Sequence, residues 1–122
     1  MSDNRLDEKL AAGAYYDYEQ HYKTMFFKFK MRKREKEMKE LTDRAMNDLS
    51  NHKQKDLVVD ILEIYFVEHV KKMADYAAAD DYFVNLCKFA LENGESVRCF
   101  SLMDRIIGYI GLKRPEISEL TA

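Results

Sequence analysis

The sequence predicts an all-α fold, an α-solenoid of about three stacked helical hairpins (TPR-like) with six main helices. Apolar residues recur at helical spacing along the chain, and glycine and proline, which interrupt helices, number only four and one in 122 residues. The breaks at Gly13, Lys53 and Gly94 are 40 and 41 residues apart. A period near 40 with two helices per unit is typical of stacked hairpins. A plain six-helix bundle whose spacing is accidental is the alternative.

Each expected helix carries one apolar stripe. The first helix, over residues 4–12, carries Leu6 and Leu10 and stops at Gly13, where a left-handed residue is favourable only for glycine. The stripes of the other five are Tyr15, Tyr18, Tyr22, Met25, Phe26 and Phe29; Met38, Leu41, Ala45 and Leu49; Leu57, Ile61, Leu62, Tyr65 and Phe66; Tyr82, Phe83, Leu86 and Ala90; and Phe100, Met103, Ile107 and Ile110.

The breaks between the helices carry turn and capping residues. Ser50 and Asn51 are expected to cap the junction of the third and fourth helices. Gly94 is expected to repeat the glycine stop, with Glu95 or Ser96 beginning the last helix. Connections near residues 31–35 and 72–75 would join one hairpin to the next.

One domain is predicted over residues 1–111, because 122 residues suit a single modest core. The chain breaks at Pro115, and no polar capping helix of the kind that a stacked array needs follows Leu112. Residues 112–122 are therefore expected to be a C-terminal tail or the start of a continuation in a longer array.

The composition indicates a cytosolic protein. The net charge is −2, charged residues make up 34% of the chain, and no apolar run approaches the roughly 20 residues of a membrane span. The polar N-terminus has no signal-peptide core. Cys87 and Cys99 lie in apolar helical stretches, which predicts reduced core residues and no disulfide.

The titratable residues do not form a catalytic pattern. His21, His52 and His69 are scattered, with no His-Glu-x-x-His spacing, and no serine or cysteine sits in a nucleophile motif. Gly108 and Gly111 do not follow a strand, so no phosphate-binding loop is expected. We expect a binding protein that is not an enzyme and that holds no metal and no cofactor.

Positive charge gathers in one part of the chain. Between residues 23 and 39 eight Lys/Arg residues face two acids. An RNA-binding surface on residues 28–39 (KFKMRKREKEMK) is one reading, because cations along a helix release phosphate counterions. The interleaved aromatic residues fall on the core stripe, and Glu35, Glu37 and Glu40 alternate with the bases as on an exposed helix. An exposed helix face without nucleic acid is therefore the preferred reading.

A second face of the helix after Gly13 is aromatic and cationic. Its residues are Tyr16, Gln20, Lys23, Phe27 and Lys30, at steps of three and four, with Arg5 and Lys9 on the helix before. This composition is typical of a protein-docking surface, although the same residues could pack under a neighbouring helix.

Two segments resemble the guided-entry adaptor family, the fourth Get protein of the tail-anchored-protein pathway. Residues 5–29 (RLDEKLAAGAYYDYEQHYKTMFFKF) are similar to the family's basic helix followed by a Gly-Asp-Tyr-Tyr-Glu-Ala-His-Gln motif, with Gly13, Tyr15, Tyr16, Asp17 and Gln20 in register. Residues 55–72 (KDLVVDILEIYFVEHVKK) are similar to its Asp-Leu-x-x-x-Leu-Leu-Glu-x-Tyr segment. The chain departs from the motif at Ala11, Ala14, Tyr18 and Glu19.

The resemblance implies a non-enzymatic adaptor that docks on the homodimeric targeting ATPase and favours its closed, nucleotide-bound form. A ubiquitin-like partner would bind a C-terminal half that these 122 residues do not include. By position, the ATPase-docking residues would be Arg5, Lys9, Tyr16, Glu19, Lys23, Phe27 and Asp56. The RNA-binding helical domain and a generic tetratricopeptide-like scaffold for an unknown peptide stay open as alternatives.

Overall fold

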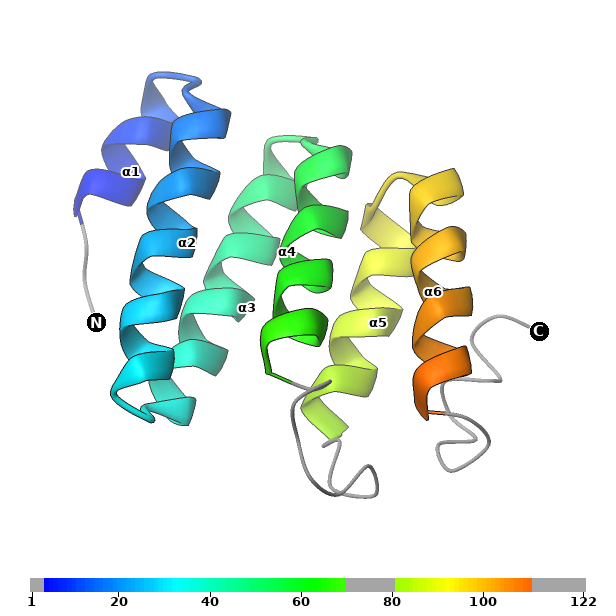
Figure 1. Ribbon diagram of the computed structural model, residues 1–122. Coiled ribbons are helices and arrows are strands. Elements are labelled where there is room, and N and C mark those ends of the chain that lie inside the picture. Colours follow the sequence, from blue (N-terminus) through cyan, green and yellow to red (C-terminus); the bar gives the residue numbers. More distant parts are fainter. Residues whose placement is uncertain (1–3, 70–80, 111–122) are drawn as a thin grey trace. The chain divides into compact units, whose positions relative to one another are not determined.

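A computed structural model describes residues 4–69 and 81–110 (Figure 1). Its elements are α1 (Asn4–Ala11), α2 (Tyr15–Met31), α3 (Glu35–Asn51), α4 (Lys55–Glu68), α5 (Asp81–Asn93) and α6 (Ser96–Ile110). For these residues the prediction of an all-α chain with six helices and no strand is confirmed. The expected connection near residues 72–75 and the segment 112–122 lie outside the described residues.

The chain divides into two compact units, Met1–Gln54 and Lys55–Ala122. The first contains α1, α2 and α3, and the second contains α4, α5 and α6. The division falls in the loop that the sequence places inside the second hairpin. That the two units form a single hairpin stack over residues 1–111 stays a prediction.

The first unit is built around one type of turn. At the end of α1 the Ala14 N–H donates to the Lys9 carbonyl (2.9 Å) and the Gly13 N–H to the Leu10 carbonyl (3.1 Å). Gly13 lies between them at φ 71°, in the left-handed region. This is the Schellman motif, which satisfies carbonyls that the end of a helix would otherwise leave without a partner. The prediction that a left-handed Gly13 ends the first helix is confirmed.

The same turn recurs every 20 residues, at positions 13, 33 and 53. Lys33 (φ 56°) ends α2 and Lys53 (φ 58°) ends α3, and in each case the next N–H donates to the carbonyl five residues back, at 2.9 and 2.8 Å. The predicted break within residues 31–35 is therefore confirmed. Ser50 and Asn51 lie in the last turn of α3, so the expectation that they cap the junction to α4 is wrong: a Schellman turn makes that junction.

The core of the first unit follows the predicted stripes. Tyr15 is only half-buried. The other stripe residues of α2 and α3 are buried, together with Leu6 of α1 and Met46 of α3. Leu10, like Tyr15, is half-buried, and Met46 was not among the predicted residues, so regular helical spacing identified most of the core of this unit.

In the second unit, aromatic rings join α4 to α5. Phe83 stacks on Phe66 with ring centroids 5.9 Å apart and 20° between the planes, and on Tyr65 at 6.3 Å. Cys87 of α5 and Cys99 of α6 are buried free thiols, as predicted.

The predicted core face of α6 is correct at Met103 and wrong at Phe100, and Ile107 is only half-buried. Its buried side chains are Cys99, Leu102, Met103 and Ile106. Phe100, predicted to be core, is 53% exposed. Two apolar stripes run side by side along this helix, and spacing alone does not choose between them.

Gly94 ends α5 for a reason other than the one predicted. It does not adopt a left-handed conformation. A Cβ at this position would lie 2.6 Å from the Ala90 carbonyl oxygen and 2.8 Å from Cγ2 of Val59, so glycine is needed for the close approach of α4. Glu95 then caps α6 as predicted, because its carboxylate accepts the backbone N–H groups of Val97 and Arg98 at 3.2 and 2.7 Å.

The left-handed lysines give a first prediction. We expect Lys33→Gly and Lys53→Gly each to raise the free energy of unfolding by about 0.5–1 kcal/mol, because glycine removes the Cβ strain of this conformation. Urea unfolding followed by circular dichroism measures the change. Lys28→Gly, at an exposed position within α2, is the matched control and should lower the stability by about 1 kcal/mol. A loss of stability in all three variants would contradict the assigned turns.

The packing at Gly94 gives a second prediction. Gly94→Ala should lower the free energy of unfolding by about 1–3 kcal/mol, because the added methyl group meets backbone atoms that cannot move aside. Gly108→Ala, in α6, is the control: a Cβ there has nothing within 4 Å and should stabilise the protein by up to about 1 kcal/mol. If the two substitutions change the free energy of unfolding equally, helix propensity alone explains the effect and the close approach at Gly94 does not.

Candidate docking surface

The orientation of α2 is set by three tyrosine hydroxyls that reach α3 or His52, the residue directly after it. The hydrogen-bonded pairs are Tyr15 with His52 Nδ1 (3.2 Å), Tyr18 with Asp48 Oδ2 (2.7 Å) and Tyr22 with Thr42 Oγ1 (2.8 Å). We call these pairs the tyrosine ladder. Their rings supply apolar contact and their hydroxyls find polar partners, so buried tyrosines can hold one helix in register with the next.

The middle of the ladder also holds α1. Asp48 lies 3.4 Å from Nε of Arg44, and Nη2 of Arg44 donates to Asp7 of α1 at 2.6 Å. Burial raises the pKa of Tyr18 well above its ordinary value of 10, and the hydrogen bond to Asp48 raises it further. Tyr18 therefore stays protonated and donates to Asp48 over the whole physiological pH range.

Because the tyrosine ladder holds one side of α2 against α3, the fourth tyrosine of α2, Tyr16, points toward solvent. Tyr16 is 70% exposed, and Phe27, eleven residues further on the same face, is 39% exposed. Lys23 lies between them, with its side chain 37% exposed. The structure thus places these three predicted docking residues on one exposed face of α2, which we call the α2 surface.

The other predicted residues differ in their accessibility. On α1, Arg5 is exposed and Lys9 half-exposed. Glu19 is only 4% exposed, and its Oε1 lies 3.5 Å from Nζ of Lys23. Its carboxylate is thus placed to orient the Lys23 ammonium rather than to contact a partner. Asp56 is exposed in the first turn of α4, in the second unit, where its carbonyl accepts a hydrogen bond from Arg98 at 2.9 Å.

The sequence did not reveal a hollow at the C-terminal end of α2. It has a volume of about 530 Å³ and is lined by Thr24, Phe27, Lys28, Met31 and Arg32. Met31 is 84% exposed, the highest value among the exposed large apolar side chains. Continuing the four-residue step from Phe27 leads to Met31, so the helical spacing contained this signal.

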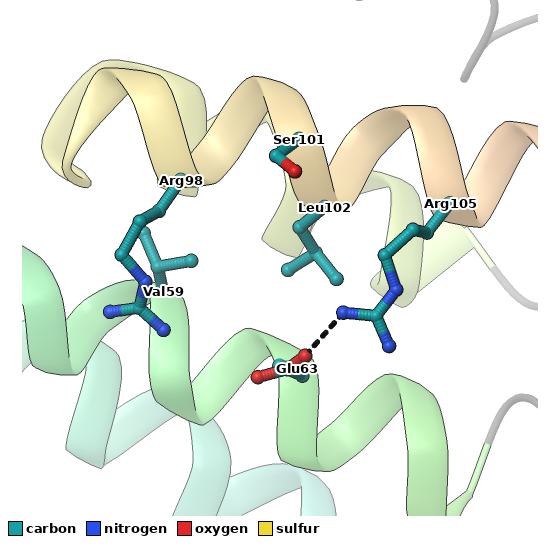
Figure 2. A pocket seen from close by; sticks show the side chains of 6 residues that line it. All are labelled: Val59, Glu63, Arg98, Ser101, Leu102 and Arg105. Carbon is teal, nitrogen blue, oxygen red and sulfur yellow. Dashed lines mark hydrogen bonds and ion pairs between the residues drawn. The ribbon is translucent and has the colours of Figure 1, made fainter.

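A smaller hollow, of about 120 Å³, lies between α4 and α6 (Figure 2). Arg98 and Arg105 extend from α6 toward α4 on either side of Leu102. Arg105 pairs with Glu63 at 2.6 Å, and Arg98 pairs with Asp60, a contact that raises the pKa of Arg98. Because each guanidinium already has a carboxylate partner, this hollow is a packing seam between the two helices.

Within residues 4–69 and 81–110, no group of three or more His, Cys, Asp or Glu side chains is arranged to hold a metal ion. In that part of the chain no helix has the length and apolar character needed to cross a membrane. His69 lies with its ring 5.1 Å from that of Tyr65, one turn earlier.

Comparison of the chain with protein-family models, with curated proteins and with solved structures gave no match. The resemblance to the guided-entry adaptor family thus stays a prediction from the two segments of sequence.

The ladder predicts a specific pH dependence. Above about pH 10 the unfolded chain releases the Tyr18 proton while the folded chain keeps it, so the free energy of unfolding falls as the pH rises. We expect Tyr18→Phe to cost about 1 kcal/mol at neutral pH and to make this alkaline loss less steep. Urea titrations at a series of pH values measure both effects.

Two features make the test specific to Tyr18. Burial also raises the pKa of Cys87, but this thiol is present in both proteins, so the difference between them isolates Tyr18. Tyr16→Phe, which removes an exposed hydroxyl, should change the stability by less than about 0.5 kcal/mol. An alkaline slope that is unchanged in Tyr18→Phe would contradict the role assigned to this hydroxyl.

Proposed function

We propose that this protein is a non-enzymatic adaptor in the targeting of tail-anchored membrane proteins, and that it docks on the homodimeric targeting ATPase in the cytosol. The observation that carries the proposal is the exposure of Tyr16 on the α2 surface, beside Lys23 and Phe27. The other three tyrosines of α2 are engaged by α3 or the residue directly after it, whereas Tyr16 is available as an aromatic anchor.

The charges of the surface support the same proposal. Lys9 and Lys23 place cations on α1 and α2, and cations steer association toward an acidic partner surface. Glu19 beneath Lys23 restricts the directions that the ammonium can take, which lowers the entropy that binding would otherwise cost. The ATPase is proposed as the partner because two segments of the sequence resemble the guided-entry family.

The RNA-binding alternative has less support. The apolar residues within the basic stretch are in part core residues, since Phe29 is 8% exposed and Met38 only 2%. RNA binders of this kind stack successive bases on exposed aromatic rings. Within residues 28–39 no exposed aromatic side chain is available for that purpose. A generic helical scaffold with another peptide partner remains the second candidate.

Binding to the purified ATPase, with and without ATP, tests the proposal. Tyr16→Ala should weaken the affinity about tenfold or more through a faster off-rate, because it removes the aromatic anchor. Lys23→Gln should lower the on-rate by a few fold and reduce its salt dependence. Glutamine is preferred to glutamate at position 23, because a new carboxylate would face the buried Glu19.

The second unit offers matched controls. Phe100→Ala removes an exposed aromatic ring and Lys88→Gln an exposed cation, and neither should change the affinity. If the wild-type protein binds but neither Tyr16→Ala nor Lys23→Gln weakens it, the α2 surface is not the docking site. If the wild-type protein does not bind the ATPase in either nucleotide state, the adaptor function is wrong and the scaffold reading takes its place.

A further inference from the structure

The hollow at the end of α2 exposes apolar surface that the packing of the first unit does not use. The large apolar side chains that line it are Phe27 and Met31, which are one helical turn apart and 39% and 84% exposed. The core face of α2 is already occupied, because Met25, Phe26 and Phe29 are buried. A flexible, polarizable methionine at an exposed position is common where a protein accommodates apolar side chains of a partner.

The part of the chain that carries the hollow is rich in positive charge. Residues 20–34 contain six Lys/Arg residues and no acid. Lys28 and Arg32 line the hollow, and Nζ of Lys30 lies 5.8 Å from the centre of the Phe27 ring. The next residues, Lys33 and Arg34, are exposed in the Schellman turn that ends α2. An apolar lining with cationic neighbours is complementary to an apolar side chain flanked by carboxylates.

We propose that this hollow binds an acidic amphipathic helix of a partner protein. Phe27 and Met31 lie four residues apart, so a helix laid along α2 meets them with apolar residues of the same spacing, while its acidic residues reach Lys28 and Arg32. The hollow itself accepts a side chain that protrudes, as a helix supplies and a flat bilayer surface does not.

The proposal does not depend on the ATPase. Its test uses Met31 and Arg32, which are not among the residues assigned to ATPase docking, so either proposal can fail without the other. Both side chains are exposed, so their substitution should leave the fold intact, and circular dichroism checks this.

The probe is a synthetic 14-residue peptide with leucines at positions i, i+3, i+4 and i+7, glutamates at four flanking positions and alanines elsewhere, because alanine favours the helix and glutamates at every other position would repel one another. It is titrated into the full chain carrying ¹³C-methyl methionine, and the methionine methyl signals are followed by NMR. Met31→Ser identifies the Met31 signal by its loss. Met38 and Met46, buried at 2% and 1% exposure, provide internal controls in the same unit.

We expect the acidic peptide to shift the Met31 methyl signal and to leave those of Met38 and Met46 in place. Fluorescence anisotropy with the labelled peptide should show binding about fivefold weaker for both Met31→Ser and Arg32→Glu. Val97→Ser, which removes an apolar side chain that is 75% exposed on α6, is the matched control and should bind like the wild type.

Three results would overturn the proposal. The first is a Met31 signal that the peptide does not shift. The second is equal binding of a scrambled peptide of the same composition, which would show that only charge is recognised. The third is tighter binding of phosphatidylserine vesicles or of single-stranded RNA than of the peptide, lost in Met31→Ser, which would assign the hollow to that ligand instead.

Discussion

The rotation of α2 about its own axis is the constraint on which the candidate surface depends. Tyr15, Tyr18 and Tyr22 lie on one side of the helix, and their hydroxyls are bonded to α3 or to the residue directly after it. Because successive residues of an α-helix are 100° apart, fixing this side directs Tyr16 and Phe27 to the opposite one. Each bond contributes only about 1 kcal/mol net, yet turning the helix would break all three and would leave the buried hydroxyls of Tyr22 and Thr42 without each other as partners. The ladder therefore defines both a core face and a binding face.

All three turns of the first unit were predicted in position, but only the one at Gly13 was predicted in conformation. Glycine adopts the left-handed conformation without steric cost, so a glycine at the end of a helix predicts it. The conformation of Gly13 was predicted correctly for that reason. Lys33 and Lys53 adopt the same conformation, but lysine has no preference for it that a sequence could show. Their left-handed state comes from the packing of the helices on either side, which overrides a local cost of about 1 kcal/mol. Residue propensities alone therefore cannot predict the left-handed conformation of these two lysines.

In the candidate site, too, helical spacing predicted the exposure of some residues, while the exposure of others depends on tertiary packing. The exposure of Tyr16, Lys23 and Phe27 followed from helical spacing, since they lie away from the apolar stripe. The burial of Glu19 did not follow, because a charged residue beside the stripe is expected to reach water. Met31 was missed for another reason: it was predicted to lie in the connection after the helix, whereas α2 continues to Met31 and exposes it one turn beyond Phe27.

The same reasoning explains why α2 is better suited to binding than a flexible loop would be. Its side chains are displayed on a helix whose buried face is held by Tyr18, Tyr22 and Phe26, each with no exposed surface. A partner meeting Tyr16 therefore pays little to order the backbone, and Glu19 already restricts Lys23. The aromatic and basic density of this segment thus has one physical origin: buried aromatic residues fix the helix, and the fixed helix presents the exposed residues in a constant arrangement.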